Sequence, residues 1–264
     1  MRVAVSSDNK TITQSQIVPT PKDFEEGIQT LNQIAQELKG GEKIEGVAGG
    51  VAGPLDQDKT MLAKSPNISG WIQKPLKQAL EKVFNVPVYL ENDANLEGLG
   101  EANFGAGSDK EIVAFVTIGT GVGGVRIVKK TIDQNALGFE PGHQIIVIDG
   151  HDCNCGGKGH LEAYIGGSYL EKIYGKKAED LADPTVWDQV AKYLAVGLQN
   201  TIVHWSPDIV ILGGSVMKSL PLDLVKEHLQ NTLTIFPRAP EIVLAKLGDS
   251  AGLYGALKLL NHNI

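Results

Sequence analysis

Apolar and polar positions in the first third of the chain follow a pattern typical of mixed α/β proteins. Apolar residues recur at helical spacing from Phe24 to Leu38, which predicts a helix that Asp23 caps and Gly40-Gly41 ends. A second helix is expected near residues 72–84. Short apolar runs predict strands at residues 2–7, 11–19, 44–51 and 86–90. The predicted order is therefore β-β-α-β-α-β.

The rest of the chain shows a similar alternation of predicted strands and helices. Strands are expected at residues 112–118, 124–129, 209–212 and 242–247, and helices at residues 187–205, 222–233 and 251–261. A loop-rich stretch extends to about Gly167. Two similar halves, each with an early hairpin and later alternating helices and strands, predict a duplicated α/β fold with a cleft between the halves.

The composition belongs to ordinary soluble globular proteins. The chain has 264 residues, of which 42% are hydrophobic and 21% charged. This length allows one large domain or two of average size, and either can bury a full hydrophobic core. Acidic residues outnumber basic ones by 31 to 24, and the arginines are only Arg2, Arg126 and Arg238. A nucleic-acid partner is therefore not expected.

Cysteine usage and apolar runs predict where the protein works. Cys153 and Cys155 are too close in sequence for an ordinary disulfide, so a reducing cytoplasm is expected. The amino terminus lacks the apolar stretch of a signal peptide, and no run of 18 apolar residues occurs. We therefore expect neither secretion nor a membrane-spanning segment.

A glycine-rich segment joins two predicted strands of the second half. It contains Gly119, Thr120, Gly121 and Gly123. Glycines at such a turn are expected to adopt positive φ and to bring backbone N–H groups close to an anion, as in phosphate-binding loops. A tight β-turn without a ligand explains the same residues equally well.

Asn92 and Asp93 directly follow a predicted apolar strand. Folds of the α/β class present ligand-binding groups at strand ends, where a carboxylate can act as general base toward a hydroxyl. Asp93 can instead cap the helix expected over residues 94–102, and the isolated pattern favours this cap.

Thiols, imidazoles and carboxylates gather within a short, glycine-rich stretch. The residues are Glu140, His143, Cys153, Cys155, His160 and Glu162. Cysteine and histidine at these separations suit tetrahedral zinc, and four protein ligands would make the site structural. The alternative is a pair of unmetallated thiols in a flexible loop.

Two further segments are candidates for ligand contact. Gly213-Gly214 follows a buried strand and allows close approach of a flat or anionic ligand, although a packing role is equally plausible. Asn67 and Trp71 can line a cleft, but a loop with one anchoring aromatic residue is the more common outcome.

Several of these motifs occur in the order found in one protein family. They are Leu90-Glu-Asn-Asp-Ala-Asn95 through Gly100-Glu101, the 119–124 hairpin, Glu140-Pro-Gly-His143, the Cys-x-Cys-Gly-x-x-Gly stretch, and residues 206–214. In this combination the sequence resembles the ROK family, especially its glucokinase-like sugar kinases. The likeness covers nearly the whole chain.

The resemblance implies an actin-like ATPase (ribonuclease H-like) fold, with two α/β domains around a cleft that binds sugar and ATP. The smaller N-terminal domain is expected to comprise residues 1–111 plus 250–264, and the larger C-terminal domain residues 112–249. It further implies a cytoplasmic homodimer that phosphorylates a hexose hydroxyl with ATP and Mg²⁺. In this context the catalytic interpretation of Asp93 is favoured over the cap.

The same resemblance assigns roles to individual residues. Asp93 would be the catalytic base, and the sugar would be bound by Asn67, Asn92, Asp93, Glu140, His143 and Glu162. ATP would be bound by Gly119, Thr120, Gly121, Gly123, Gly213 and Gly214. Structural Zn²⁺ would be bound by His143, Cys153, Cys155 and His160, and it would order the loop that carries sugar-binding residues.

The sequence departs from the family pattern at three places. His160 replaces the third family cysteine, which leaves a Cys₂His₂ set that still suits zinc. Ser206-Pro207 stands where the family often has Asn-Pro, a minor change. The chain also lacks the opening strand and Asp-x-Gly-Gly-Thr-Lys loop of the family. Loss of that mid-sheet strand would either bring its neighbours together or leave a slot, and we expect impaired phosphate transfer.

Alternative functions remain open at this point. They are a non-catalytic sugar-binding ROK protein and an N-acylmannosamine kinase. A sugar-responsive repressor is less expected, because the family's repressors carry an N-terminal helix-turn-helix and no room for one exists ahead of Arg2.

Overall fold

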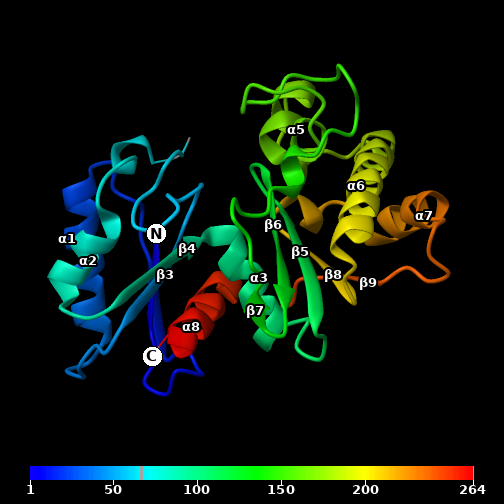
Figure 1. Ribbon diagram of the computed structural model, residues 1–264. Helices are drawn as coiled ribbons and strands as arrows, with labels where there is room; N and C mark the ends of the chain where they lie inside the picture. Colours follow the sequence, from blue (N-terminus) through cyan, green and yellow to red (C-terminus); the bar gives the residue numbers. More distant parts are fainter. Residues whose placement is uncertain (66–67, 264) are drawn as a thin grey trace. The chain divides into compact units, whose positions relative to one another are not determined.

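The computed structural model describes residues 1–65 and 68–263, which form two compact units (Figure 1). The first unit comprises Met1–Asn103 and Asp249–Ile264, and the second comprises Phe104–Gly248. The chain thus crosses between the units at the end of one helix, rather than at the start of the strand expected at residue 112. Across the described residues, no helix has the length and apolar character needed to cross a membrane.

The first unit contains two separate two-stranded sheets. Its elements are β1 (Arg2–Val5), β2 (Gln14–Ile17), α1 (Phe24–Leu38), β3 (Val47–Val51), η1 (Ser69–Trp71), α2 (Leu76–Phe84), β4 (Val88–Asn92), α3 (Asp93–Phe104), η5 (Gly248–Ser250) and α8 (Ala251–Asn263). Strands β1 and β2 are antiparallel, and β3 and β4 are parallel. Helices α1 and α2 contribute Phe24, Ile28 and Leu80 to a buried cluster that also contains Trp71 and Leu90.

Strands β1 and β3 do not pair with each other. Among the described residues, β1 pairs only with β2, and β3 pairs only with β4. From the sequence we expect either that these two strands pair or that they stay unpaired with each other, and in the described residues they stay unpaired.

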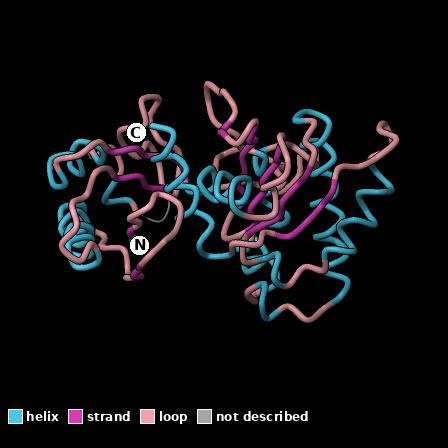
Figure 2. Tube along the Cα trace, turned by 90° about the horizontal axis from the view of Figure 1, so that it is seen from below, coloured by secondary structure: helices cyan, strands magenta, loops and turns pink. Residues whose placement is uncertain are grey.

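The second unit is built on one five-stranded sheet in the order β7-β6-β5-β8-β9, flanked by helices (Figure 2). Its elements are β5 (Ile112–Ile118), β6 (Val122–Val128), β7 (Thr131–Ile132), η2 (Pro141–His143), α4 (Glu162–Ile165), α5 (Gly167–Tyr174), η3 (Ala178–Asp180), α6 (Pro184–Trp205), β8 (Ile209–Gly213), η4 (Val216–Lys218), α7 (Leu222–Thr232) and β9 (Glu241–Leu244). Strand β8 runs parallel to both β5 and β9, so the carboxyl ends of three neighbouring strands share one edge.

Some element boundaries differ from those predicted, for local reasons. The helix expected from residue 72 begins at Leu76, because Gln73 has φ 56° and Pro75 precedes the first helical turn. Helix α6 begins earlier than residue 187, since the Asp183 carboxylate accepts the N–H of Thr185 at 2.9 Å and caps it at Pro184.

Candidate active site and metal centre

The carboxyl end of β4 leads directly into α3 through Asn92 and Asp93. Asp93 is the first residue of the helix, and Oδ1 of Asn92 accepts the N–H of Asn95 at 3.2 Å. Nδ2 of Asn92 donates to the backbone oxygen of Gly53 at 3.2 Å. The cap that the isolated pattern favoured for Asp93 is thus made by Asn92, so that prediction is wrong.

The Asp93 carboxylate makes few hydrogen bonds with the rest of the protein. Its Oδ1 accepts the N–H of Ala94 at 2.9 Å, and the backbone N–H of Asp93 itself also donates to this carboxylate. No side chain among residues 1–65 and 68–263 donates a hydrogen bond to it. Asp93 reaches solvent, yet desolvation by the surrounding protein raises the pKa of its carboxyl, against the lowering effect of the Ala94 N–H. A carboxylate that has a raised pKa and is not paired with a cation or another side chain is suited to accept a proton.

The turn between β5 and β6 does not have the backbone conformation predicted for it. In the described chain, Gly119, Gly121 and Gly123 do not have positive φ. A Cβ at position 121 would lie 2.5 Å from Oε2 of Glu162, so a side chain there would displace that carboxylate. The same oxygen accepts the N–H of Val122 at 2.9 Å, so the Glu162 side chain shapes the turn.

Helix α5 also holds this turn. The N–H groups of Gly167 and Ser168 donate to the backbone oxygens of Gly119 and Thr120 at 2.8 and 3.0 Å. In the described part of the chain, the N–H groups of Thr120 and Gly121 donate no hydrogen bond. Two such N–H groups in one turn are suited to bind an anion such as a phosphate.

Gly213 is the last residue of β8, and Gly214 follows it. Both lie at the end of the sheet where β5 leads into the 119–121 turn. Thr117 of β5 lies opposite Gly123 in β6 and opposite Gly213 in β8. Gly214 has φ 92°, and a Cβ there would lie 2.2 Å from the backbone oxygen of Ile118. Close packing of the backbone thus accounts for Gly214, while nucleotide contact by either glycine stays a prediction.

The four predicted metal ligands converge in the second unit. The ligand atoms of His143, Cys153, Cys155 and His160 all lie within 4.8 Å of one another. Nδ1 of His143 is 3.7 Å from Sγ of Cys153, and Nδ1 of His160 is 3.2 Å from Sγ of Cys155. Since zinc binds nitrogen and sulfur at about 2.0–2.3 Å in tetrahedral sites, this donor set is compatible with zinc.

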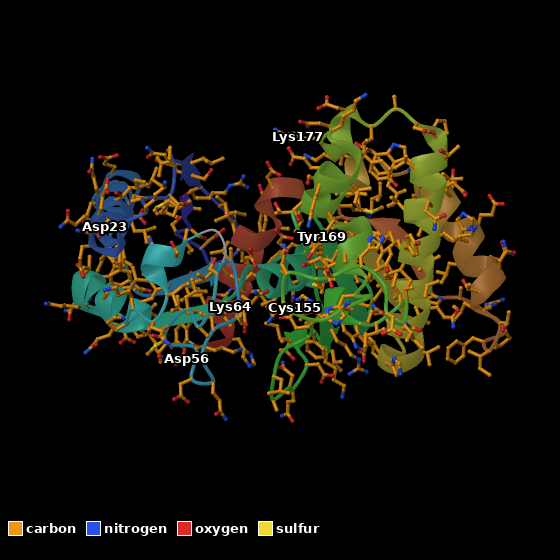
Figure 3. The ribbon with its side chains drawn as sticks, turned by 90° about the horizontal axis from the view of Figure 1, so that it is seen from above. Asp23, Asp56, Lys64, Cys155, Tyr169 and Lys177 are labelled. Atoms are coloured by element: carbon orange, nitrogen blue, oxygen red, sulfur yellow. The ribbon has the colours of Figure 1, made fainter. Side chains whose placement is uncertain are left out.

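Two tyrosines anchor the loop that carries these ligands. The N–H of His151 donates to the Tyr164 hydroxyl at 2.9 Å, and the N–H of Asn154 donates to the Tyr169 hydroxyl. Figure 3 labels Tyr169 and Cys155. Within the loop, the N–H of Cys153 donates to the backbone oxygen of Gly157 at 2.8 Å. The ligands are therefore placed by protein hydrogen bonds as well as by any metal.

Glu140 lies beside this cluster. Its Oε2 is 3.9 Å from Nε2 of His143, whose other ring nitrogen faces Cys153. Burial raises the pKa of the Glu140 carboxyl, His143 opposes this rise, and Glu162 adds to it. At 3.9 Å these two atoms are too far apart for a hydrogen bond, so Glu140 is a charged neighbour of the His143 ring and does not fix its orientation.

The predicted site residues fall in both units. Asn92, Asp93 and Trp71 belong to the first unit, and the other described candidates belong to the second. Trp71 is buried, and its Nε1 donates to the backbone oxygen of Pro21, as expected for an anchoring aromatic residue. Asn67 lies outside the described residues. Sequence reasoning missed the buried Glu91 and its partner Lys59, although a carboxylate inside an apolar strand was a signal that could have found them.

Comparison with known proteins identifies the family. The chain matches the ROK family over residues 1–263. It is 28% identical to a glucokinase of Thermotoga maritima, over 98% of this chain and 93% of that protein. Xylose repressors are also among its relatives.

Solved structures give the same result. A ROK hexokinase from Thermus thermophilus is 31% identical, with a TM-score of 0.88 over 97% of this chain and 93% of that one. A ROK family glucokinase from Streptomyces griseus, solved with glucose and AMPPNP, is 28% identical, with a TM-score of 0.82 over 97% and 94%. The fold is therefore the actin-like ATPase fold, and the chain belongs to the ROK family.

Proposed function

We propose that this protein is a sugar kinase that transfers the γ-phosphoryl group of ATP to a hydroxyl of a hexose. The observation that supports it best is the Asp93 carboxylate, which stands at the start of α3, accepts hydrogen bonds from backbone N–H groups alone in the described chain, and has a raised pKa. The glucokinases and the hexokinase among its relatives make a sugar hydroxyl the natural proton donor.

The proposed chemistry is a single displacement. Asp93 takes the proton of the hydroxyl, the hydroxyl oxygen bonds to the γ-phosphorus, and the bond from that phosphorus to the bridging oxygen of ATP breaks, releasing ADP. The N–H groups of Thr120 and Gly121 supply donors for phosphate oxygens, whose remaining charge Mg²⁺ would neutralise. Glu140, His143, Glu162 and Asn92 supply acceptors and donors for the other sugar hydroxyls.

Zinc has a structural role in this proposal. His143, Cys153, Cys155 and His160 would bind it, and it would close the loop between η2 and α4. Because His143 is both a ligand and a neighbour of Glu140, a closed loop would orient the residues proposed to bind sugar. The cytoplasmic location and the homodimer stay predictions.

The proposal is tested with a coupled assay on glucose, mannose and N-acetylmannosamine, using wild type and Asp93→Asn. Asn keeps the shape of the side chain but cannot accept the proton, so kcat should fall by about 10²–10⁴-fold while sugar still binds in calorimetry. Since a general base must be ionised and the pKa of Asp93 is raised, kcat should be lost at low pH, starting above the range of an ordinary carboxyl. Equal turnover of the two proteins would refute the proposal.

A non-catalytic sugar-binding protein is the second candidate. The observation that favours it is that xylose repressors, as well as glucokinases, are among the relatives of this chain. Calorimetry with glucose and with AMPPNP, run separately, distinguishes the two functions. A kinase should bind both ligands, and a sugar-binding protein should bind only the first.

A further inference from the structure

A buried carboxylate lies two residues before the proposed catalytic base in the sequence. The Glu91 side chain is only 4% exposed, although it lies in β4, two residues ahead of Asp93. Its Oε1 accepts the N–H of Asn92 and the Nδ2 of Asn95, both at 2.9 Å. Its Oε2 pairs with Nζ of Lys59. A charge buried this far is costly unless it is paired, and Lys59 is the paired cation.

The turn that carries Lys59 is under local strain. Lys59 has φ 52°, a left-handed conformation that favours glycine. The Asp56 carboxylate holds the turn by accepting the N–H groups of Thr60 and Met61 at 2.6 and 2.7 Å (Figure 3). The Lys59 side chain is 48% exposed, so its own burial does not explain a lysine at this position. The contact with Glu91 does.

Glu91 in turn fixes the first turn of α3. It holds the backbone of Asn92 and the side chain of Asn95, and these two residues are joined by the bond from the Asn95 N–H to Oδ1 of Asn92. Asp93 lies between them in the chain. The direction of its carboxylate therefore depends on a network that Lys59 completes from a position 32 residues away in sequence.

We propose that Lys59 is a positioning residue, which holds Glu91 and thereby sets the orientation of Asp93 toward the hydroxyl that it deprotonates. This inference rests on the proposed function. It differs from a purely stabilising role because it predicts a loss of kcat at nearly unchanged KM for ATP, together with rescue by a residue that restores the cation.

The test compares Lys59→Gly with Lys129→Gly. Lys129 also has a left-handed backbone, with φ 50°, but in the described chain its side chain has no hydrogen-bond or ion-pair partner. Both substitutions remove backbone strain, so Lys129→Gly should raise Tm by about 2–4 °C and leave kcat unchanged. Lys59→Gly removes the cation as well, so it should lower kcat by about 10- to 100-fold. Lys59→Arg should recover most of that loss.

A second measurement does not depend on turnover. Hydrogen exchange of residues 91–96 should speed up in Lys59→Gly and stay at the wild-type rate in Lys129→Gly and Lys59→Arg. If wild type has no kinase activity, the proposed function fails, and this exchange still decides whether Lys59 fixes the start of α3. Wild-type kcat and wild-type exchange in Lys59→Gly would overturn the positioning role.

Discussion

The two units differ in how completely their strands are paired and buried. In the second unit, β8 lies between two parallel neighbours and all five of its residues are buried. In the first unit, β3 has one paired neighbour, and of its residues only Val51 is buried, while Gly50 is exposed. Both are short apolar strands. The difference therefore comes from the neighbours that each strand has.

Unpaired strand edges carry a cost that a complete sheet avoids. Each unpaired backbone N–H and C=O must find water, and a two-stranded sheet has little face to bury. Strand β1 has no buried residue, and it pairs only with β2 in the described part of the chain. We therefore expect the first unit to open more readily than the second.

The largest test of this comparison adds a strand to the first unit. A version extended at its amino terminus by a strand that ends in an Asp-x-Gly-Gly-Thr-Lys loop should give β1 and β3 a shared partner. Hydrogen exchange of their amides should then slow by about 100-fold, which corresponds to about 2.8 kcal/mol, while amides in β5 and β8 exchange as before. The same version should transfer phosphate faster. Unchanged exchange in β1 and β3 would show that the added strand does not pair there.

A matched pair of substitutions tests the same comparison inside the strands. Val210 in β8 is 0% exposed, whereas Val47 in β3 is only partly buried. Val210→Ala should cost about 2 kcal/mol, since it removes two buried methyl groups and leaves a cavity. Val47→Ala should cost less than about 1 kcal/mol. Denaturant unfolding of both variants measures the difference, and equal costs would contradict the contrast drawn between the strands.

The sequence predicts local features of this fold better than contacts between distant residues. The Asp23 cap of α1 is confirmed, with Oδ1 accepting the N–H of Glu26 at 2.9 Å, because a cap involves residues three positions apart. The positive φ expected for the 119–123 glycines is wrong, and the contact that Gly121 makes with Glu162 joins residues 41 positions apart in sequence. No local pattern carries this information.

The candidate site shows the same division. The convergence of Cys153, Cys155 and His160 follows from close spacing in one loop, and His143 joins them through the bridge between Ile145 and His160. The isolated pattern places the α3 cap on Asp93, but Asn92 makes it, since the cap depends on where the helix begins. The Lys59–Glu91 pair joins a strained turn to a strand, and only the tertiary fold brings them together.

The smallest expected effect concerns zinc, whose proposed ligands all lie in the second unit. Protein produced with zinc should contain about one zinc ion per chain by elemental analysis. The loop is also held by the hydroxyls of Tyr164 and Tyr169, and the unit has its own extensive core. Chelation should therefore lower the Tm of the second unit by only a few degrees, or about 1 kcal/mol, and leave the first unit unchanged.

A change at position 160 sharpens this zinc prediction. His160→Cys supplies a third thiolate and should make zinc harder to remove by a chelator, whereas His160→Ala should make it easier. Protein without zinc after metal-supplemented expression would contradict the proposed site. If chelation instead lowered the Tm of the first unit by a large amount, the stabilising effect of the metal would not be confined to the second unit.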